Sequence, residues 1–268
     1  MSRISGADAI VETLVANGVD TLFGLPGGQL DHLFDSIYRS EGKIRLVRPR
    51  HEQGCAYMAY GYAKSTGKVG AYTVVPGPGL LNSTAALCTA YAANAQVLCI
   101  SGQVPTAGIG SGEGHLHEIP DQLALIRGLT KWAERIEHPT QTPQLMHEAF
   151  RQLTTGRPRP VEVEMPMDVM ALEVEVAAPI PPGPPVHPPV DPLQVEKAVE
   201  LLAGAKKPLI IVGGGAVDAG DKKLRIEVGK RGKGQHVEGL SIENDGSRPL
   251  GDAEHFVALG SRLVLHGV

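Results

Sequence analysis

The fold is decided by "RLVRPRHEQGCAYMAYGYAKSTGKVGAYTVVPGPGLLN", residues Arg45–Asn82. A short apolar run leads into Glu52, a helical pattern covers 52–65, and a second apolar run ends in a Pro-Gly-Pro-Gly turn. Strand, helix and strand in this order predict a crossover unit of a parallel sheet. Glu52 is the unusual residue, because here a carboxylate opens a helix that is rich in Ala, Met and Tyr.

The same alternation continues on both sides of this stretch. Strand-like apolar runs recur at 19–25, 43–49, 69–75, 95–102 and 159–166, and helical patterns at 6–17, 27–40, 83–94, 121–128 and 143–154. We therefore expect an α/β fold over residues 1–176, with a parallel sheet of the six-stranded type and helices on both faces. A Gly-rich loop interrupts the pattern at 101–121, and loops of this length are usually functional or mobile.

The remainder of the chain predicts a linker and a partial second domain. Residues 177–192 are rich in proline, which predicts an extended linker. Residues 193–268 begin with a helix, strand and glycine turn, and predict a partial middle α/β domain with a divergent tail. The glycines of that turn miss the G-x-G-x-x-G register, because Asp218 stands where the last glycine is needed, so we reject a nicotinamide-dependent dehydrogenase.

The composition is that of an ordinary soluble globular protein. The chain has 268 residues, 42% of them hydrophobic, and a formal net charge of −4, so no bulk positive charge attracts it to nucleic acid. It has no apolar run of about 18 residues that predicts a membrane span. The first 18 residues indicate a helix rather than a secretory signal. Cys55, Cys88 and Cys99 stand among apolar residues, and we expect them to be buried in a protein of the reducing cytoplasm.

Glu52 has an ordinary interpretation as well as a functional one. A helix N-terminus stabilises a carboxylate by about 0.3–1 kcal/mol, and Glu52 could do no more than that. The zinc motif H-E-x-x-H is excluded because Cys55 replaces its second histidine. The functional interpretation comes from position, because Glu52 and the turn at Pro76 each follow a strand end. The carboxyl ends of parallel strands are where ligands bind.

Several motifs in one order resemble a known family. "FGLPGG", "RHEQGCAYMAYGYAKSTGKVGA", "PGPGLLN", "SGQVPT" and "TGRPRPVEVEMPMDV" resemble the amino-terminal half of thiamine diphosphate enzymes of the acetolactate synthase type, over about Ser2–Leu172. The segment "PLIIVGGGA" resembles the start of the middle domain of that family. The resemblance implies decarboxylation or carboligation of 2-oxo acids, a transferase or lyase activity that depends on thiamine diphosphate.

The resemblance also implies catalytic roles for two residues. Glu52 would share a proton with the aminopyrimidine of the cofactor, whose imino form then takes the proton of the thiazolium carbon. A carboxyl group enclosed by apolar walls suits this role, because burial raises its pKa. His117 stands where acetolactate synthases carry a glutamine near the substrate, and an imidazole there could shuttle protons. An exposed loop histidine is the alternative interpretation.

The other site residues implied by the resemblance come from the same motifs. The cofactor-binding set is Glu52, Pro76, Gly77, Gly79, Asn82, Gln103 and Arg157, and the substrate-side set is Pro26, Gly27 and Gly28. The turn at 76–79 would pack against the pyrimidine ring, although a plain strand–helix turn remains an alternative. We reject a metal site at His115, His117 and Glu118, because no fourth ligand has a clear spacing.

The sequence also departs from the family. Met167 replaces a lysine, and Arg159 replaces a glycine beside the flavin-associated Arg157, so FAD binding remains an open question. From about Asp221 the match is lost, and "ENDGSRP" lacks the surroundings of the "GDG…N" motif that holds diphosphate and Mg²⁺. We therefore expect a truncated chain that forms a homodimer or larger oligomer, with Mg²⁺ held by a missing domain or a separate chain. The alternative is a non-catalytic remnant or binding module of the same fold.

Overall fold

The computed structural model describes residues 1–183 and 191–204. The chain divides into two units, Met1–His187 and Pro188–Val268. In the second unit, helix α8 (Pro192–Gly204) follows the proline-rich segment. The predicted strand, glycine turn and divergent tail lie outside the described residues, so the predicted domain boundaries and the partial middle domain stay predictions.

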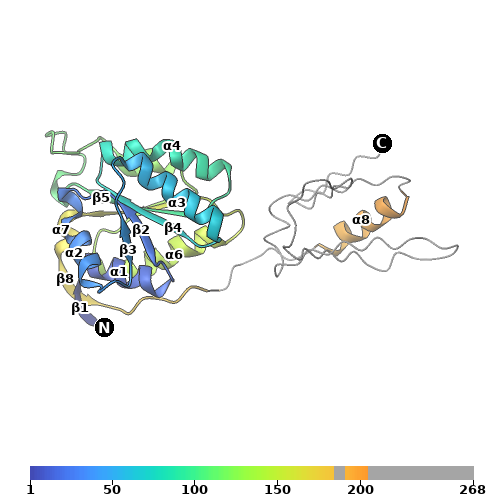
Figure 1. Ribbon diagram of the computed structural model, residues 1–268, viewed down its shortest axis with the longest axis horizontal. Coiled ribbons are helices and arrows are strands. Elements are labelled where there is room, and N and C mark those ends of the chain that lie inside the picture. Colours follow the sequence, from blue (N-terminus) through green and yellow to red (C-terminus); the bar gives the residue numbers. More distant parts are fainter. Residues whose placement is uncertain (184–190, 205–268) are drawn as a thin grey trace. The chain divides into compact units, whose positions relative to one another are not determined.

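The first unit is built on a parallel sheet of six strands (Figure 1). Its strands are β2 (Thr21–Gly24), β3 (Arg45–Val47), β4 (Gly70–Val74), β5 (Val97–Gln103), β6 (Trp132–Arg135) and β7 (Val161–Pro166). They lie in the order β3-β2-β4-β5-β7-β6, and every neighbouring pair is parallel. The helices are α1 (Gly6–Ala16), α2 (Asp31–Arg39), α3 (Glu52–Thr66), α4 (Pro78–Ala92), α5 (Gln122–Arg127), α6 (Thr142–Thr154) and α7 (Met167–Ala171). The predicted α/β class is confirmed.

Two hydrophobic cores cover the two faces of the sheet. In Figure 1, α3 and α4 lie above the strands and α1 and α6 below them. The lower core holds large aliphatic side chains from α1, α2, α6 and alternate strand positions, including Leu14, Leu33, Leu98, Ile100 and Leu153. The upper core holds many small side chains from α3 and α4, including Cys55, Ala56, Ala59, Ala86 and Ala90. Because side chains alternate along a strand, β4 and β5 contribute to both cores.

The alanines of α3 allow that helix to lie close to the sheet. A Cβ atom at Gly70, the first residue of β4, would collide with the backbone of Ala59. A small residue on each side therefore permits the contact. The helix ends at Gly67, whose φ of 71° is the left-handed conformation that terminates many helices. The helix and the following strand are thus connected by a short turn.

Three features differ from the sequence-based prediction. The pattern did not predict β6, a four-residue edge strand. It also predicted helix for the first residues, whereas β1 (Ser2–Ser5) pairs antiparallel with β8 (Glu173–Val176) before α1 begins. Finally, Cys55 and Cys99 are buried as expected, but Cys88 is exposed, because it lies on the outer side of α4.

Within residues 1–183 and 191–204, no helix combines the length and the hydropathy needed to cross a membrane.

Candidate active site

Glu52 is the first residue of α3 and follows the edge strand β3. The His51 side chain caps the helix, because its Nδ1 accepts a hydrogen bond of 3.1 Å from the backbone N–H of Gln53. We expected a carboxyl group enclosed by apolar walls. In this chain alone Glu52 is only half-buried, so part of its surface stays open. The enclosing wall is therefore not complete within the described residues.

Helix α4 brings an amide to this carboxylate. Asn82 lies on the exposed side of α4, and its Nδ2 donates a hydrogen bond of 3.0 Å to Oε2 of Glu52. The other oxygen, Oε1, lies beside Gly79, because a Cβ atom at Gly79 would be 3.7 Å from it. The structure thus brings Glu52, Gly79 and Asn82 together from two helices that begin at the same edge of the sheet.

The turn between β4 and α4 requires glycine at one position. Gly77 has a φ of 57°, a conformation that other residues rarely adopt. A Cβ atom there would also collide with the backbone carbonyl of His117. Pro76 and Gly77 are both buried. The turn is therefore covered by the loop that carries His117.

Gln29 joins that loop to the segment after β2. Its Nε2 donates a hydrogen bond of 3.0 Å to the carbonyl of Leu116, and its Oε1 lies 2.9 Å from Nδ1 of His117. Because Oε1 can only accept, Nδ1 of His117 is the donor in this contact. His117 itself is half-buried and has a φ of 72°. Its ring is therefore oriented by a fixed amide rather than free in solvent.

The three substrate-side residues follow β2 at the same edge. Gly27 packs directly on Val75, because a Cβ atom at Gly27 would collide with a methyl group of that valine. Pro26 and Gly28 are exposed. The "FGLPGG" segment therefore lies against the residue that precedes the Pro76 turn.

Glu118 has a role that the sequence did not indicate. Its carboxylate accepts hydrogen bonds from the backbone N–H groups of Gly112, Gly114 and His115, at 2.7, 2.9 and 3.0 Å. These bonds, led by that of Gly112, lower the pKa of Glu118. The sequence pattern offers Glu118 only as a candidate metal ligand. A carboxylate that closely follows several glycines is the signal that could have indicated this loop-ordering role.

Gln103 and Met167 lie at the same edge of the sheet but in different environments. Gln103 is buried at the end of β5, in register with Pro166, and its Oε1 accepts a hydrogen bond of 2.8 Å from its neighbour Val104. Met167 is the half-buried first residue of α7. Both therefore border the edge at which Glu52 lies.

Arg157 lies at the opposite edge. It is exposed and precedes the start of β7, and its carbonyl accepts a hydrogen bond from Nζ of Lys131. The neighbouring Arg159 places its guanidinium 3.9 Å from the ring centre of Tyr91, near the end of α4. The structure therefore does not bring Arg157 to the group around Glu52.

A buried thiol lies behind the carboxylate. Burial, and then the charge of Glu52, raises the pKa of Cys55 to about 12. Cys55 is therefore an uncharged part of the α3 wall at neutral pH. No set of three His, Cys, Asp or Glu side chains in the described part of the chain is arranged to hold a metal ion.

Comparison with known proteins identifies the domain. Residues 4–125 match the family model of the thiamine pyrophosphate enzyme N-terminal TPP binding domain. The chain is 37% identical over 239 residues to acetolactate synthase of Arthrospira platensis, covering 86% of this chain and 41% of that protein. It is 39% identical over 222 residues to a probable 2-ketoarginine decarboxylase of Pseudomonas aeruginosa, covering 81% and 39%. It is 33% identical over 221 residues to glyoxylate carboligase of Escherichia coli O157:H7, covering 82% and 37%. The chain thus spans about two fifths of the length of these curated relatives.

The parallel sheet and the matched residues define the amino-terminal region as a thiamine diphosphate-binding domain. More particularly, this region belongs to the acetolactate synthase-like group of thiamine diphosphate-dependent enzymes. The resemblance expected from the sequence motifs is confirmed at this level.

Proposed function

We propose that this chain supplies the pyrimidine-binding part of an enzyme that decarboxylates or ligates 2-oxo acids, with Glu52 as the group that activates the cofactor. The observation that carries the proposal is the position of Glu52, held by Asn82 beside Gly79 at the carboxyl edge of the sheet. The names of two relatives support the substrate class, because glyoxylate and 2-ketoarginine are both 2-oxo acids.

The residues present fit the aminopyrimidine ring of thiamine diphosphate. A Cβ atom at Gly79 would lie 3.7 Å from Oε1 of Glu52, so the missing side chain leaves this oxygen accessible to a flat ring. The Glu52 carboxyl group can exchange a proton with a ring nitrogen, and the amide of Asn82 can orient that carboxyl group. A partly open carboxyl group beside the backbone of Gly79 is therefore suited to a heteroaromatic base.

When bound, thiamine diphosphate would supply a nucleophilic carbon for chemistry at the keto group, and Glu52, Asn82 and Gly79 would hold its aminopyrimidine ring. Glu52 would hold or release the proton that it exchanges with a nitrogen of the aminopyrimidine ring. Asn82 donates to Oε2, which leaves Oε1 as the oxygen available for proton transfer. His117 donates from Nδ1 to Gln29, so in the neutral ring Nε2 is the nitrogen that can accept a proton from a substrate.

The rest of the site is proposed to come from elsewhere. Because Glu52 stays partly open in this chain, we propose that a second subunit covers it in a homodimer or larger oligomer. The diphosphate and Mg²⁺ would be held by residues of another domain or another chain. The proposal includes no flavin, because Arg157 lies at the opposite edge and does not fit a role beside Glu52. A cytoplasmic location would keep the buried thiols reduced.

The proposal is tested by Glu52→Gln, which keeps the shape of the side chain but cannot ionise. In the assembled protein, we expect consumption of 2-oxo acid to fall by about 10²-fold or more. The melting temperature should change little. Glu12→Gln, at an exposed position of α1, is the matched control and should retain activity.

Two outcomes would contradict the proposal. Undiminished turnover in Glu52→Gln would remove the assigned role. A wild-type assembly that consumes no 2-oxo acid, and whose melting temperature does not rise with thiamine diphosphate and Mg²⁺, would favour the non-catalytic binding module instead.

A further inference from the structure

Strand β7 carries two glutamates on one face. Val163 and Met165 belong to the core beneath α1 and α6. The alternating residues Glu162 and Glu164 therefore face the opposite side, and both are completely buried. Carboxyl groups inside a protein are costly unless they are paired or keep a proton. The role proposed for Glu52 does not explain this pair.

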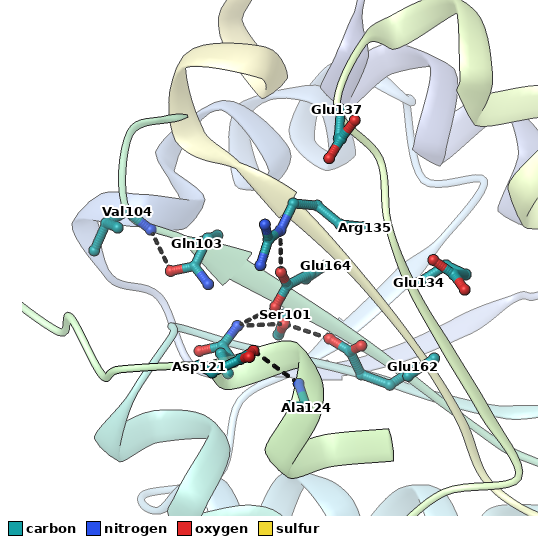
Figure 2. A network of polar contacts seen from close by, with 12 residues as sticks. Ser101, Gln103, Val104, Asp121, Ala124, Glu134, Arg135, Glu137, Glu162 and Glu164 are labelled. Carbon is teal, nitrogen blue, oxygen red and sulfur yellow. Dashed lines mark hydrogen bonds and ion pairs between the residues drawn. The ribbon is translucent and has the colours of Figure 1, made fainter. Parts of the chain in front are cut away.

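The two glutamates have unequal partners (Figure 2). Glu164 forms an ion pair with the Nε of Arg135 on β6, and its Oε2 accepts a hydrogen bond of 2.8 Å from Gln122. Glu162 has one partner, the hydroxyl group of Ser101, at 2.5 Å from Oε1. Its Oε2 is buried and has no hydrogen-bond partner among the described residues. The guanidinium of Arg135 therefore pairs with Glu164 and not with Glu162.

This arrangement favours the protonated form of Glu162. Burial, and then the charge of Glu164, raises its pKa well above the ordinary value, although the hydrogen bond from Ser101 and the charges of Arg135 and Arg127 act in the opposite direction. Two other groups face the pair, Tyr72 on β4 and Cys99 on β5. Burial raises the pKa of each, so both side chains are uncharged. The neutral form of Glu162 is therefore favoured beside Glu164, which is paired with arginine.

Gln122 connects the pair to the candidate active site. It is the buried first residue of α5, and its Nε2 lies 2.8 Å from Oε2 of Glu164 and 3.0 Å from the carbonyl of Gly102. Both are acceptors, so the nitrogen end of the amide must face them. The oxygen end is thereby directed at the backbone N–H of Gly77, which donates to it at 2.8 Å.

We propose that Gln122 is a positioning residue for the Gly77 turn, oriented by Glu164 and supported by Ser101 and Glu162. The link to catalysis rests on the proposed function, in which this turn receives the cofactor. The hydrogen bond fixes the peptide group of Gly77, which has a positive φ of 57°. A buried side chain more than 40 residues away in sequence thus sets the backbone of the turn.

The test is amide hydrogen exchange measured by NMR on the full chain. Gln122→Met keeps the approximate volume but removes both hydrogen-bonding groups. We expect the protection factor of Gly77 to fall about tenfold or more, because its N–H loses its buried acceptor. The amides of Ile10 and Leu14 in α1 should stay within about twofold. Gln144→Met, at an exposed position of α6, is the matched control and should leave Gly77 unchanged. An unchanged Gly77 in Gln122→Met overturns the proposal.

A second variant separates orientation from volume. In Gln122→Glu a protonated carboxyl group can accept from Gly77 and donate toward Glu164, whereas an ionised one faces that carboxylate directly. We expect higher protection of Gly77 at about pH 5.5 than at about pH 8 in this variant, and low protection at both values in Gln122→Met. Equal protection of Gly77 at both values in Gln122→Glu overturns the orienting role of Glu164. This variant also decides the question if Gln122→Met does not fold.

Cofactor binding separates this inference from the proposed function. The rise in melting temperature with thiamine diphosphate and Mg²⁺ should be smaller in Gln122→Met than in the wild type. Equal shifts in both proteins overturn the positioning role. No shift in the wild type counts against the proposed function, whereas the exchange of Gly77 still decides whether Gln122 positions the turn.

Discussion

The two faces of the six-stranded sheet are packed with different chemistry. The face covered by α1 and α6 buries large aliphatic side chains such as Leu14, Leu98 and Leu153. The face covered by α3, α4 and α5 buries alanines and cysteines, together with Ser101, Gln122 and two glutamates. Both faces contain completely buried side chains, so burial alone does not distinguish them.

The difference indicates how this domain separates stability from function. Apolar burial supplies stability on the first face without requiring any particular hydrogen bond. On the second face, small side chains let α3 approach the sheet, and the polar groups determine the orientation of the Gly77 turn. Glu52 and Asn82, which are proposed to act on the cofactor, belong to α3 and α4, the helices that cover this second face.

The largest effect should come from the aliphatic face. Leu98→Ala removes a completely buried side chain of β5, and we expect it to lower the free energy of unfolding by about 2–5 kcal/mol. Urea unfolding would measure the loss, which should not vary with pH because no titratable group is removed. Leu125→Ala, on the outer side of α5 and 38% exposed, should cost no more than about 0.5 kcal/mol. Equal losses in the two variants would contradict the assignment of this core.

A pH-dependent effect should come from Glu162 on the other face. Folded Glu162 keeps its proton above the pH at which the unfolded chain loses it, because burial and Glu164 raise its pKa above the ordinary 4.5. The wild-type free energy of unfolding should therefore decrease as pH rises from that value toward the folded pKa, with a slope of up to about 1.4 kcal/mol per pH unit. Glu162→Gln removes this contribution, so its stability relative to the wild type should increase with pH. Urea unfolding between about pH 5 and about pH 8 would measure the difference in free energy of unfolding between the variant and the wild type. A difference that does not change with pH would show that Glu162 is ionised when folded.

The smallest effect should come from the start of α1, which lies outside the polar group of Glu162, Glu164 and Gln122. Ser5 caps α1, with its Oγ 3.0 Å from the N–H of Asp8, and Asp8 returns the contact in a capping box. Ser5→Ala should cost about 1 kcal/mol. Thermal unfolding would detect it, with Ser65→Ala at an exposed position of α3 as the control. A loss as large as that of Leu98→Ala would mean that the β1–β8 pair, and not only the cap, depends on Ser5.

Much of the fold could be predicted from periodicity. The helical patterns at 6–17, 52–65 and 143–154 and the central strands agree closely with the structure, because each is long or strongly apolar. Strand β6 was missed because its four residues, Trp-Ala-Glu-Arg, combine an edge position with two charges. The pairing of β1 with β8 joins residues about 170 positions apart, and a local pattern carries no information on such a contact.

The candidate site was predictable in part. The motifs placed Glu52, Asn82 and the glycines of the turn near one another, and the structure brings them together. The glutamates of "VEVEMP" could not be predicted as buried, because alternation of apolar and charged residues normally indicates a strand with one face in water. Their partners Ser101 and Gln122 lie 61 and 42 residues away, on elements that only the folded chain brings together.

The antiparallel pairing of β1 with β8 has a mechanical consequence. Ser2 lies opposite Val176 and Ser5 opposite Glu173, so β1 and β8, the first and last strands of the unit, pair residue by residue along their length. A pulling force applied between Met1 and the chain beyond Val176 would open this ribbon one pair at a time, from Ser2 inward. The six central strands would carry the load only after that ribbon had separated.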